Sequence, residues 1–578
     1  MRHPFIIEGR GARRPMPPTM AGGTTGVSRR RVGSRLWPAA RVAVGVLVLA
    51  AFAGVAALYL LSLTPSLSTE GDNAGYIILA KALATGHGYT DIQEPTPRIE
   101  AQYPPVFPLL LAPVVRLWGT GAVWPMEALV TACALGAFVL AFVLFRRWTG
   151  STLLALTITL GTASSDLVWS FAHRVLTEIP YLFITLLACW WATRYAGQAR
   201  WRTWSGALAA LAVAAAFLTR TIGLGLCVAL PLYLLLAPPL RDADWRRRLC
   251  KAAFITLILI ILAGGWTLRN RFVYAGHGHN YIEQFLQTQS TGPDTQPLGL
   301  PGLLYRVNVA AHYYAGTYAR LLNGPTWAHV SASAALSPGL LVLSMLGFVY
   351  ALIRRRTLAE FYLVGYSGIV LLWPWHDVRF VVPILPFLIY YLATALTVPW
   401  RLFARVHPVD PRRAVALILL ALSVPTGLVT LHVALADHQA GYHTREWPAT
   451  ADWRDFHAAA LWLRRCAPPG SVVINRSPNL MYLWSGRLSR VYPYSFHRVY
   501  VLRDISKDRT DYVVDDKLWP IDTTFLYLEP VLRLYADRFQ RVYAIHGTTI
   551  YRVRHVHSGV ASVHAQQREP TMCLGNRP

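Results

Sequence analysis

Long apolar segments, separated by short charged ones, dominate the pattern of hydrophobic and polar positions along this chain. Hydrophobic residues make up 54% of the 578 residues, and charged residues only 15%. An apolar run of about 20 residues is long enough to cross a membrane as a helix. The pattern therefore predicts a polytopic α-helical membrane protein with about eleven transmembrane helices, over residues 37–61, 124–145, 150–168, 179–196, 203–218, 222–237, 251–268, 336–353, 358–372, 380–398 and 414–433.

The charges between these segments predict an orientation. Arginine clusters at 146–147, 246–248 and 354–356 fall in alternate loops, whereas the other loops carry acids. Cytoplasmic loops of membrane proteins are enriched in Lys and Arg, so the N-terminus is predicted to be cytoplasmic. An odd number of spans then puts the C-terminus outside. This distribution also accounts for the net charge of +26 without a nucleic-acid partner.

Four regions follow from this reading. Residues 1–36 hold eight arginines and are predicted to be a disordered cytoplasmic tail near anionic lipid. Residues 37–436 form the membrane unit, whose large outer loops are 62–123 and 269–335. Residues 437–578 lose the long apolar runs and are predicted to be an extracytoplasmic α/β domain, with a flexible tail after 556.

Shorter patterns give local detail. Apolar spacing predicts interfacial helices at 76–84 and 105–118 in the first outer loop. The C-terminal region predicts alternating elements, namely helices at 453–465 and 480–484, strands at 471–475 and 511–515, and a hairpin of 541–546 with 549–553. Cys466 and Cys573 would both lie outside, but the sequence alone does not decide whether they pair.

Asp72 is the first candidate for chemistry. It follows the first predicted span, and an acid at the mouth of a membrane protein is costly unless water, a cation or a substrate compensates it. Asp72 could instead cap a helix beginning at Asn73. Arg220 interrupts an apolar stretch, so a partner is expected for its charge.

The motifs around Asp72 resemble the first outer loop of GT-C glycosyltransferases. They are most similar to bacterial members related to protein mannosyltransferases and aminoarabinose transferases. The resemblance lies in residues 70–83, Gly86-His87-Gly88-Tyr89 and Tyr103-Pro104-Pro105, and continues at 174–180, 217–220 and 377–386. Further likeness in the C-terminal region, at 462–470 and 482–487, extends it over about residues 37–550.

The resemblance implies an inverting enzyme of the inner membrane that uses a polyprenyl-phosphate sugar as donor. The acceptor would be a lipid, a glycan or a protein. By the same resemblance Asp72 is the general base. The candidate substrate-binding residues are Glu70, Tyr76, Tyr103, Arg174, Glu178, Arg220 and Arg379. Many relatives have a second acid where this chain has Asn73, which weakens the case for paired carboxylates holding a metal. No metal ligand is predicted, and a role for a divalent cation stays open.

Each of these residues also has a structural interpretation. Glu178 would favour the dipole at a helix start, and Arg174 and Arg379 could contact lipid headgroups. Arginine nevertheless holds phosphate through a forked set of donors. Two other functions remain open, namely a transporter or flippase of lipid-linked sugars and a non-catalytic membrane scaffold. A transporter would be expected to carry internal repeats and broken helices at the membrane midplane, and no repeat is visible in the sequence.

Overall fold

The computed structural model describes residues 38–69, 71–236, 244–273, 285–287, 296–323, 331–403, 410–439, 450–519 and 522–555. The chain divides into two units, Met1–Ala50 and Ala51–Pro578. The described part of the first unit is the beginning of helix α1 (Pro38–Leu61). The predicted tails 1–36 and 557–578 lie outside the described residues.

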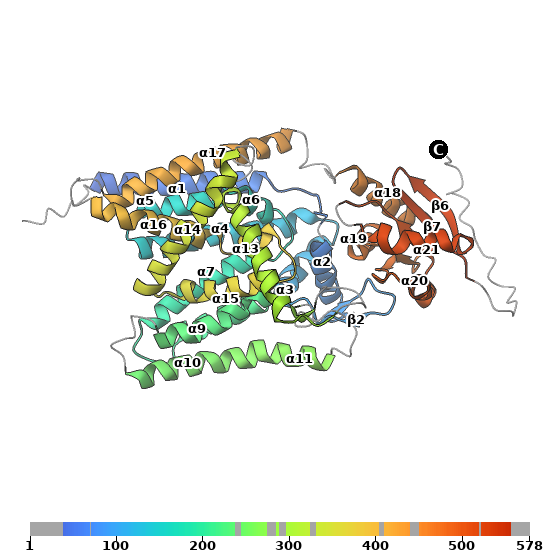
Figure 1. Ribbon diagram of the computed structural model, residues 1–578, viewed down its shortest axis with the longest axis horizontal. Helices are drawn as coiled ribbons and strands as arrows, with labels where there is room; N and C mark the ends of the chain where they lie inside the picture. The colour runs from blue at the N-terminus through green and yellow to red at the C-terminus, as the bar shows by residue number, and fades with distance from the viewer. Residues whose placement is uncertain are drawn as a thin grey trace, which may run out of the picture. The chain divides into compact units, whose positions relative to one another are not determined.

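Long apolar helices form most of the second unit (Figure 1). Among the described residues, five helices are long and apolar enough to cross a membrane, or six if one bent pair counts as a single span. They are the 42–61 part of α1, α4 (Val123–Thr149), the continuous α10–η3–α11 (Trp245–Val273), the 337–354 part of α14 (Ser331–Arg354) and α17 (Pro411–Gln439). The polytopic helical architecture is thus confirmed, while the number eleven stays a prediction.

The other predicted spans are also helical. They correspond to α7 (Glu178–Ala196), α8 (Trp204–Phe217), α9 (Leu224–Leu236), α15 (Leu358–Leu372) and α16 (Leu385–Phe403). Of these, α8, α15 and the stretches 221–236 and 385–400 are apolar but only 10–17 residues long. A straight span needs about 20 residues, so these helices are shorter than the usual length of a span.

Three segments differ from the sequence prediction. Residues 150–168 are not one straight span, because α5 (Thr152–Ala163) and α6 (Asp166–Ala172) meet at 64°. In the outer loop 269–335, α13 (Leu300–Asn323) is a long helix whose polar residues hide it from a search for apolar runs. The span predicted at 251–268 is present within one continuous helix, and differs only in having the π-helix η3 (Ile260–Gly264) between α10 (Trp245–Leu259) and α11 (Gly265–Val273).

The first outer loop folds into α2 (Gly71–Ala84), a short antiparallel pair β1 (Thr90–Asp91) and β2 (Arg98–Ile99), and α3 (Val106–Trp118). Both helices predicted in this loop are present, while their position at the membrane interface stays a prediction. Most of α2 is buried, because it packs against α3 and against α19 of the C-terminal region.

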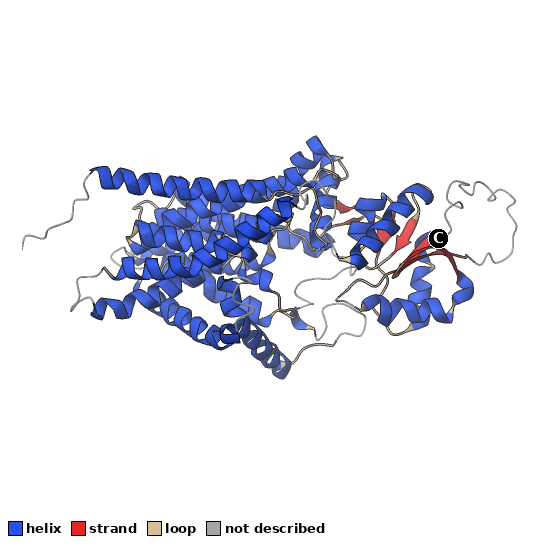
Figure 2. Ribbon diagram, turned by 90° about the horizontal axis from the view of Figure 1, so that it is seen from above, coloured by secondary structure: helices blue, strands red, loops and turns tan. Residues whose placement is uncertain are grey.

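The C-terminal region forms a five-stranded mixed sheet (Figure 2). The strand order is β4-β3-β5-β7-β6, with β3 parallel to β4 and β5, and β7 antiparallel to β5 and β6. The predicted helices, strands and hairpin are all present, as α18 (Ala451–Cys466), β3 (Val472–Ile474), α19 (Pro478–Ser485), β5 (Tyr512–Asp515), β6 (Phe539–Ile545) and β7 (Thr548–Val553). The elements not predicted are β4 (Leu488–Arg490), α20 (Arg498–Ile505), η6 (Lys507–Arg509), η7 (Thr524–Leu528), α21 (Glu529–Leu534) and η8 (Ala536–Arg538).

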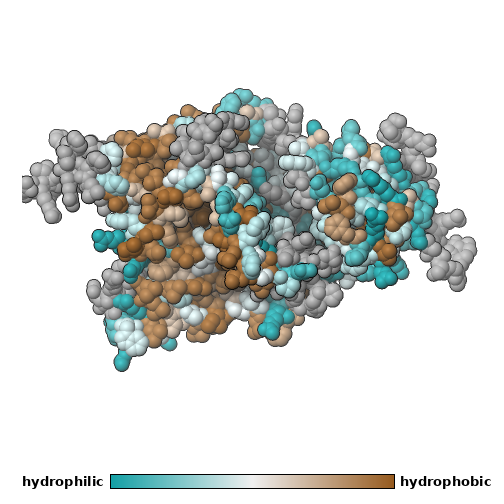
Figure 3. Space-filling view, in the orientation of Figure 1, coloured by the Kyte–Doolittle hydropathy of each residue, from teal (hydrophilic) through white to brown (hydrophobic). Residues whose placement is uncertain are grey.

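Both faces of this sheet are covered. Successive strand residues point to opposite faces, so Val473 and Val514 pack under α18 and α19 while Ile474 and Val513 pack under α20, η7 and α21. Cys466, at the end of α18, is disulfide-bonded, whereas Cys573 lies outside the described residues. Apolar side chains gather over the long helices, and hydrophilic ones over the sheet-bearing region (Figure 3). The domain boundary at 437 and the extracytoplasmic side stay predictions.

Contacts join α2 and the first outer loop to the C-terminal region. Lys81 Nζ donates a hydrogen bond to the Tyr482 hydroxyl at 3.0 Å, and the backbone N–H of Ser489 donates to the Gln93 carbonyl at 2.8 Å. Leu480 of α19 is buried in the core that the membrane helices share. The helix that carries Asp72 is therefore packed between the membrane unit and the C-terminal sheet.

Candidate active site

A cavity of about 2100 Å³ lies among the first outer loop, the membrane helices and the C-terminal region. Its polar wall comes from α2, residues 98–104, the start of α7, the connection between α8 and α9, and the 3₁₀ helix η5 (Val378–Val381). Its apolar wall comes from α9, η3 and α15. Residues 490–493, with Tyr500 and Asp504, add a wall from the C-terminal region.

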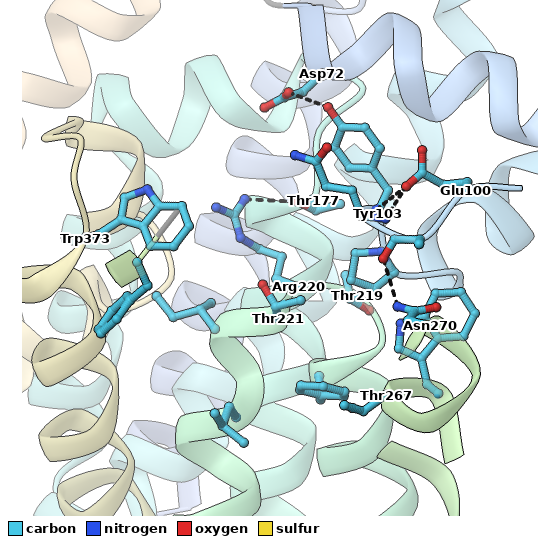
Figure 4. Close-up of a pocket in the computed structure, with 18 of the residues that line it drawn as sticks. Asp72, Glu100, Tyr103, Thr177, Thr219, Arg220, Thr221, Thr267, Asn270 and Trp373 are labelled. Atoms are coloured by element: carbon cyan, nitrogen blue, oxygen red, sulfur yellow. Dashed lines mark hydrogen bonds between the residues drawn. The ribbon is translucent and has the colours of Figure 1, made fainter. Parts of the chain in front are cut away.

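Asp72 lies on the polar wall, in the first turn of α2 (Figure 4). Its Oδ1 accepts a hydrogen bond from the Tyr103 hydroxyl at 2.8 Å, and its Oδ2 accepts one from Arg379 Nη1 at 2.9 Å. The side chain is still 37% exposed, so the carboxylate is both oriented and accessible. The alternative of a cap for a helix starting at Asn73 fits poorly, because α2 already begins at Gly71.

Arg379 brings a second carboxylate to the same place. Its Nε lies 3.5 Å from Asp377 Oδ2, and its backbone N–H donates to Asp377 Oδ1 at 2.9 Å. Asp377 is thus the N-cap of η5. Sequence reasoning missed this role, although Asp377 stands in the same motif as Arg379.

Glu178 and Arg220 form a second, buried ion pair at the cavity. The Glu178 side chain is 1% exposed and that of Arg220 is 15% exposed. Arg220 Nη1 also donates to the Thr177 hydroxyl at 2.9 Å (Figure 4). The expectation of a partner for Arg220 is thus confirmed. Removing one member of a buried ion pair costs about 3–5 kcal/mol of folding stability. The pair therefore helps to hold the start of α7, which carries Glu178, beside the cavity.

The two predicted tyrosines also line the cavity. The rings of Tyr76 and Tyr103 meet edge to face with centroids 5.0 Å apart, and the Tyr76 hydroxyl lies 3.5 Å from the Thr177 hydroxyl. Arg174 is different, because it does not line the cavity and its guanidinium lies 4.9 Å from the centroid of the Phe171 ring. Glu70 lies outside the described residues.

Sequence reasoning also missed a pair of carboxyl groups, Asp91 and Glu100, which line the cavity and share a hydrogen bond. Glu100 Oε1 accepts the backbone N–H of Tyr103 at 2.9 Å (Figure 4), and the Glu100 carbonyl accepts from Arg269 Nη1 at 2.5 Å. Burial and the neighbouring Glu100 raise the pKa of Asp91 to about 8, and burial raises the pKa of Glu100. The pair therefore retains a proton at neutral pH, next to the turn that positions Tyr103.

This pair predicts a pH dependence of stability. Because the pKa of Asp91 is raised by folding, the folded state binds more protons than the unfolded one between the ordinary value and about 8. The pair's contribution is complete at acid pH and is lost as the pH rises to about 8. The melting temperature should fall from about pH 5 to pH 8 more steeply for the wild type than for Asp91→Asn. Parallel curves for the two proteins would contradict the shared proton.

Across the described ranges, no three His, Cys, Asp or Glu side chains group together as a metal site. Asn73 is fully buried and donates to the Ser68 carbonyl at 2.6 Å. It therefore does not stand beside Asp72 on the cavity wall.

Residues 102–266 match the family model described as dolichyl-phosphate-mannose-protein mannosyltransferase. No curated protein matches the chain. Among solved structures, the fold is similar to that of apo ArnT from Cupriavidus metallidurans, at 13% identity and a TM-score of 0.56, over 88% of this chain and 98% of that one. The same enzyme bound to undecaprenyl phosphate gives a TM-score of 0.52 over the same shares of the two chains, again at 13% identity.

A third similar structure is the archaeal oligosaccharyltransferase AglB from Archaeoglobus fulgidus, in complex with an inhibitory peptide and a dolichol-phosphate. It has a TM-score of 0.52 and 13% identity, over 88% of this chain and 74% of that one. At these identities the likeness concerns the fold. The resemblance drawn from the sequence is confirmed at that level: this chain has the fold of the GT-C glycosyltransferases and, over residues 102–266, matches one of their family models.

Proposed function

We propose that this protein is an inverting membrane glycosyltransferase that moves a sugar from a polyprenyl-phosphate carrier to an acceptor on the outer face of the membrane. The observation that carries the proposal is the position of Asp72. An accessible carboxylate faces the cavity beside Arg379, while Glu178 and Arg220 form a second charged pair nearby. A base next to cationic groups is what sugar transfer from a lipid phosphate requires.

The reaction would be a single displacement. Asp72 takes the proton of the acceptor hydroxyl as the acceptor oxygen bonds to the anomeric carbon. The bond between that carbon and the phosphate oxygen breaks, and its electron pair leaves with the polyprenyl phosphate. Arg379 and Arg220, which both line the cavity, would stabilise the charge that grows on the leaving phosphate.

The cavity also suits a lipid carrier. Its apolar wall includes Leu224, Val228 and Ile260, whose side chains are more than half exposed. An apolar chain could lie along this wall while the phosphate reaches the arginines. ArnT bound to undecaprenyl phosphate and AglB in complex with a dolichol-phosphate are structures with polyprenyl-phosphate ligands. They support a polyprenyl-phosphate carrier for this protein.

A donor screen tests the function. Purified protein in lipid nanodiscs would be incubated with radiolabelled polyprenyl-phosphate sugars and a cell-envelope extract, and labelled products would be separated. We expect one donor to label a lipid, glycan or protein product with the wild type and not with Asp72→Asn. Donor binding without any labelled product would instead favour a transporter or flippase.

The outer location predicts a labelling pattern. Cysteines introduced one at a time at Glu94 and Tyr500, with the native cysteines kept, should react with an impermeant thiol reagent in spheroplasts. One at Arg355 should react only after lysis, because alternate loops face opposite sides. Native Cys250 is exposed beside the Arg246–Arg248 cluster and serves as an internal control that should stay unlabelled in spheroplasts. Labelling confined to Arg355→Cys and Cys250 would reverse the orientation.

A further inference from the structure

Two carboxylates already surround the guanidinium that the proposed function assigns to the donor phosphate. Arg379 lies 2.9 Å from Asp72 Oδ2 and 3.5 Å from Asp377 Oδ2. Because the two carboxylates carry two negative charges and Arg379 only one positive charge, this group has one negative charge in excess. A phosphate that approaches Arg379 is therefore repelled unless one carboxylate moves away.

The two carboxylates differ in how firmly they are held. Asp377 is anchored to the backbone, because its Oδ1 accepts the N–H of Arg379 itself at 2.9 Å and caps η5. Asp72 is held at Oδ2 by Arg379 and at Oδ1 by the Tyr103 hydroxyl. Both printed contacts of the Asp72 carboxylate are to side chains, which can move without disturbing the backbone, so Asp72 is the carboxylate that can leave.

We infer that Asp72 occupies the phosphate-binding position at Arg379 until the donor arrives, and that the donor phosphate displaces it. This inference rests on the proposed function for the identity of the donor. Phosphate offers the fork of Arg379 the same kind of oxygen acceptors as a carboxylate. The exchange thus replaces one ionic hydrogen bond with another and leaves Asp72 free of its cation.

An order of binding follows. While Asp72 is paired with Arg379, its Oδ2 is occupied by that hydrogen bond and is not available to the acceptor hydroxyl. Once the donor phosphate is bound, the carboxylate is held by Tyr103 alone and can accept the proton of an acceptor hydroxyl. The donor then binds before the acceptor becomes reactive, and Tyr103 acts as a positioning residue for the released base.

Affinity for undecaprenyl phosphate tests the competition, because it requires no catalysis. Asp72→Asn removes the competing charge and keeps the side-chain size, so the affinity should rise about tenfold or more. The matched control is Glu94→Gln, which removes one negative charge from the same cavity at a residue paired with Arg98 rather than Arg379. The affinity of the Glu94→Gln protein for undecaprenyl phosphate should equal that of the wild type.

The double variant Asp72→Asn/Arg379→Ala completes the test. The gain from Asp72→Asn should vanish when Arg379 is absent, because the competition is for that side chain. Unchanged or weaker affinity in Asp72→Asn, or an equal gain in Glu94→Gln, would overturn the inference. If the gain in affinity depends on Arg379 but the wild-type protein transfers no sugar, the competition between Asp72 and phosphate is supported and the proposed function is contradicted.

Discussion

Asp72→Asn is expected to lower the rate of sugar transfer by about 10²–10⁴-fold, the usual contribution of a general base. The amide has the size of the carboxylate and can still accept from the Tyr103 hydroxyl, so the protein should fold and bind donor. Only the proton acceptor is lost. Initial rates at saturating donor, measured with the labelled donor found in the screen, check this expectation.

Asp72→Glu separates a catalytic role from a purely structural one. The extra methylene moves the carboxylate past both the Tyr103 hydroxyl and Arg379, so little activity should return. If Asp72 only supported the start of α2, Asn would be well tolerated at that position. Transfer by Asp72→Asn at nearly the wild-type rate would falsify the catalytic assignment and favour the transporter or scaffold interpretation.

Arg379→Ala is expected to raise the donor KM about ten- to a hundredfold, because an ionic hydrogen bond is worth roughly 1.5–3 kcal/mol. Use of the acceptor should change less, since the lost contact is to the leaving phosphate. Steady-state kinetics with each substrate varied in turn separate the two effects. Arg98→Ala is the control, because Arg98 also lines the cavity but pairs with Glu94 rather than with Asp72. Unchanged donor kinetics in a folded Arg379→Ala protein would remove the phosphate assignment.

The helical architecture was largely predictable because a membrane span has a single strong requirement, a continuous apolar run. That requirement located α1, α4, α15 and α17 closely. A search for apolar runs did not predict helices that are amphipathic or bent. The amphipathic α13 carries tyrosine, histidine and arginine along its length, and a break at Ser164 and Ser165 bends the pair α5 and α6.

The candidate site was predictable as a set of residues but not as a set of contacts. Asp72, Glu178, Arg220 and Arg379 each stood out because charge is costly next to a membrane. Their partners come from distant parts of the chain, as when Arg379 pairs with Asp72 across 307 positions. Asp91 and Glu100 drew no attention because an acid in an outer loop is ordinary, and only folding brings the two carboxyl groups together.

The packing of α19 against α2 limits how the C-terminal region can be exchanged between homologous enzymes. A Cβ atom added at Gly75, one helical turn after Asp72, would lie 3.2 Å from the Asn479 amide and 3.5 Å from the Tyr103 ring. A chimera joined near residue 437 would bring a foreign side chain to that contact and lose the Lys81–Tyr482 hydrogen bond. Because α2 and α19 are fitted to each other, we expect a C-terminal region exchanged without α2 to lower the stability of the chimera.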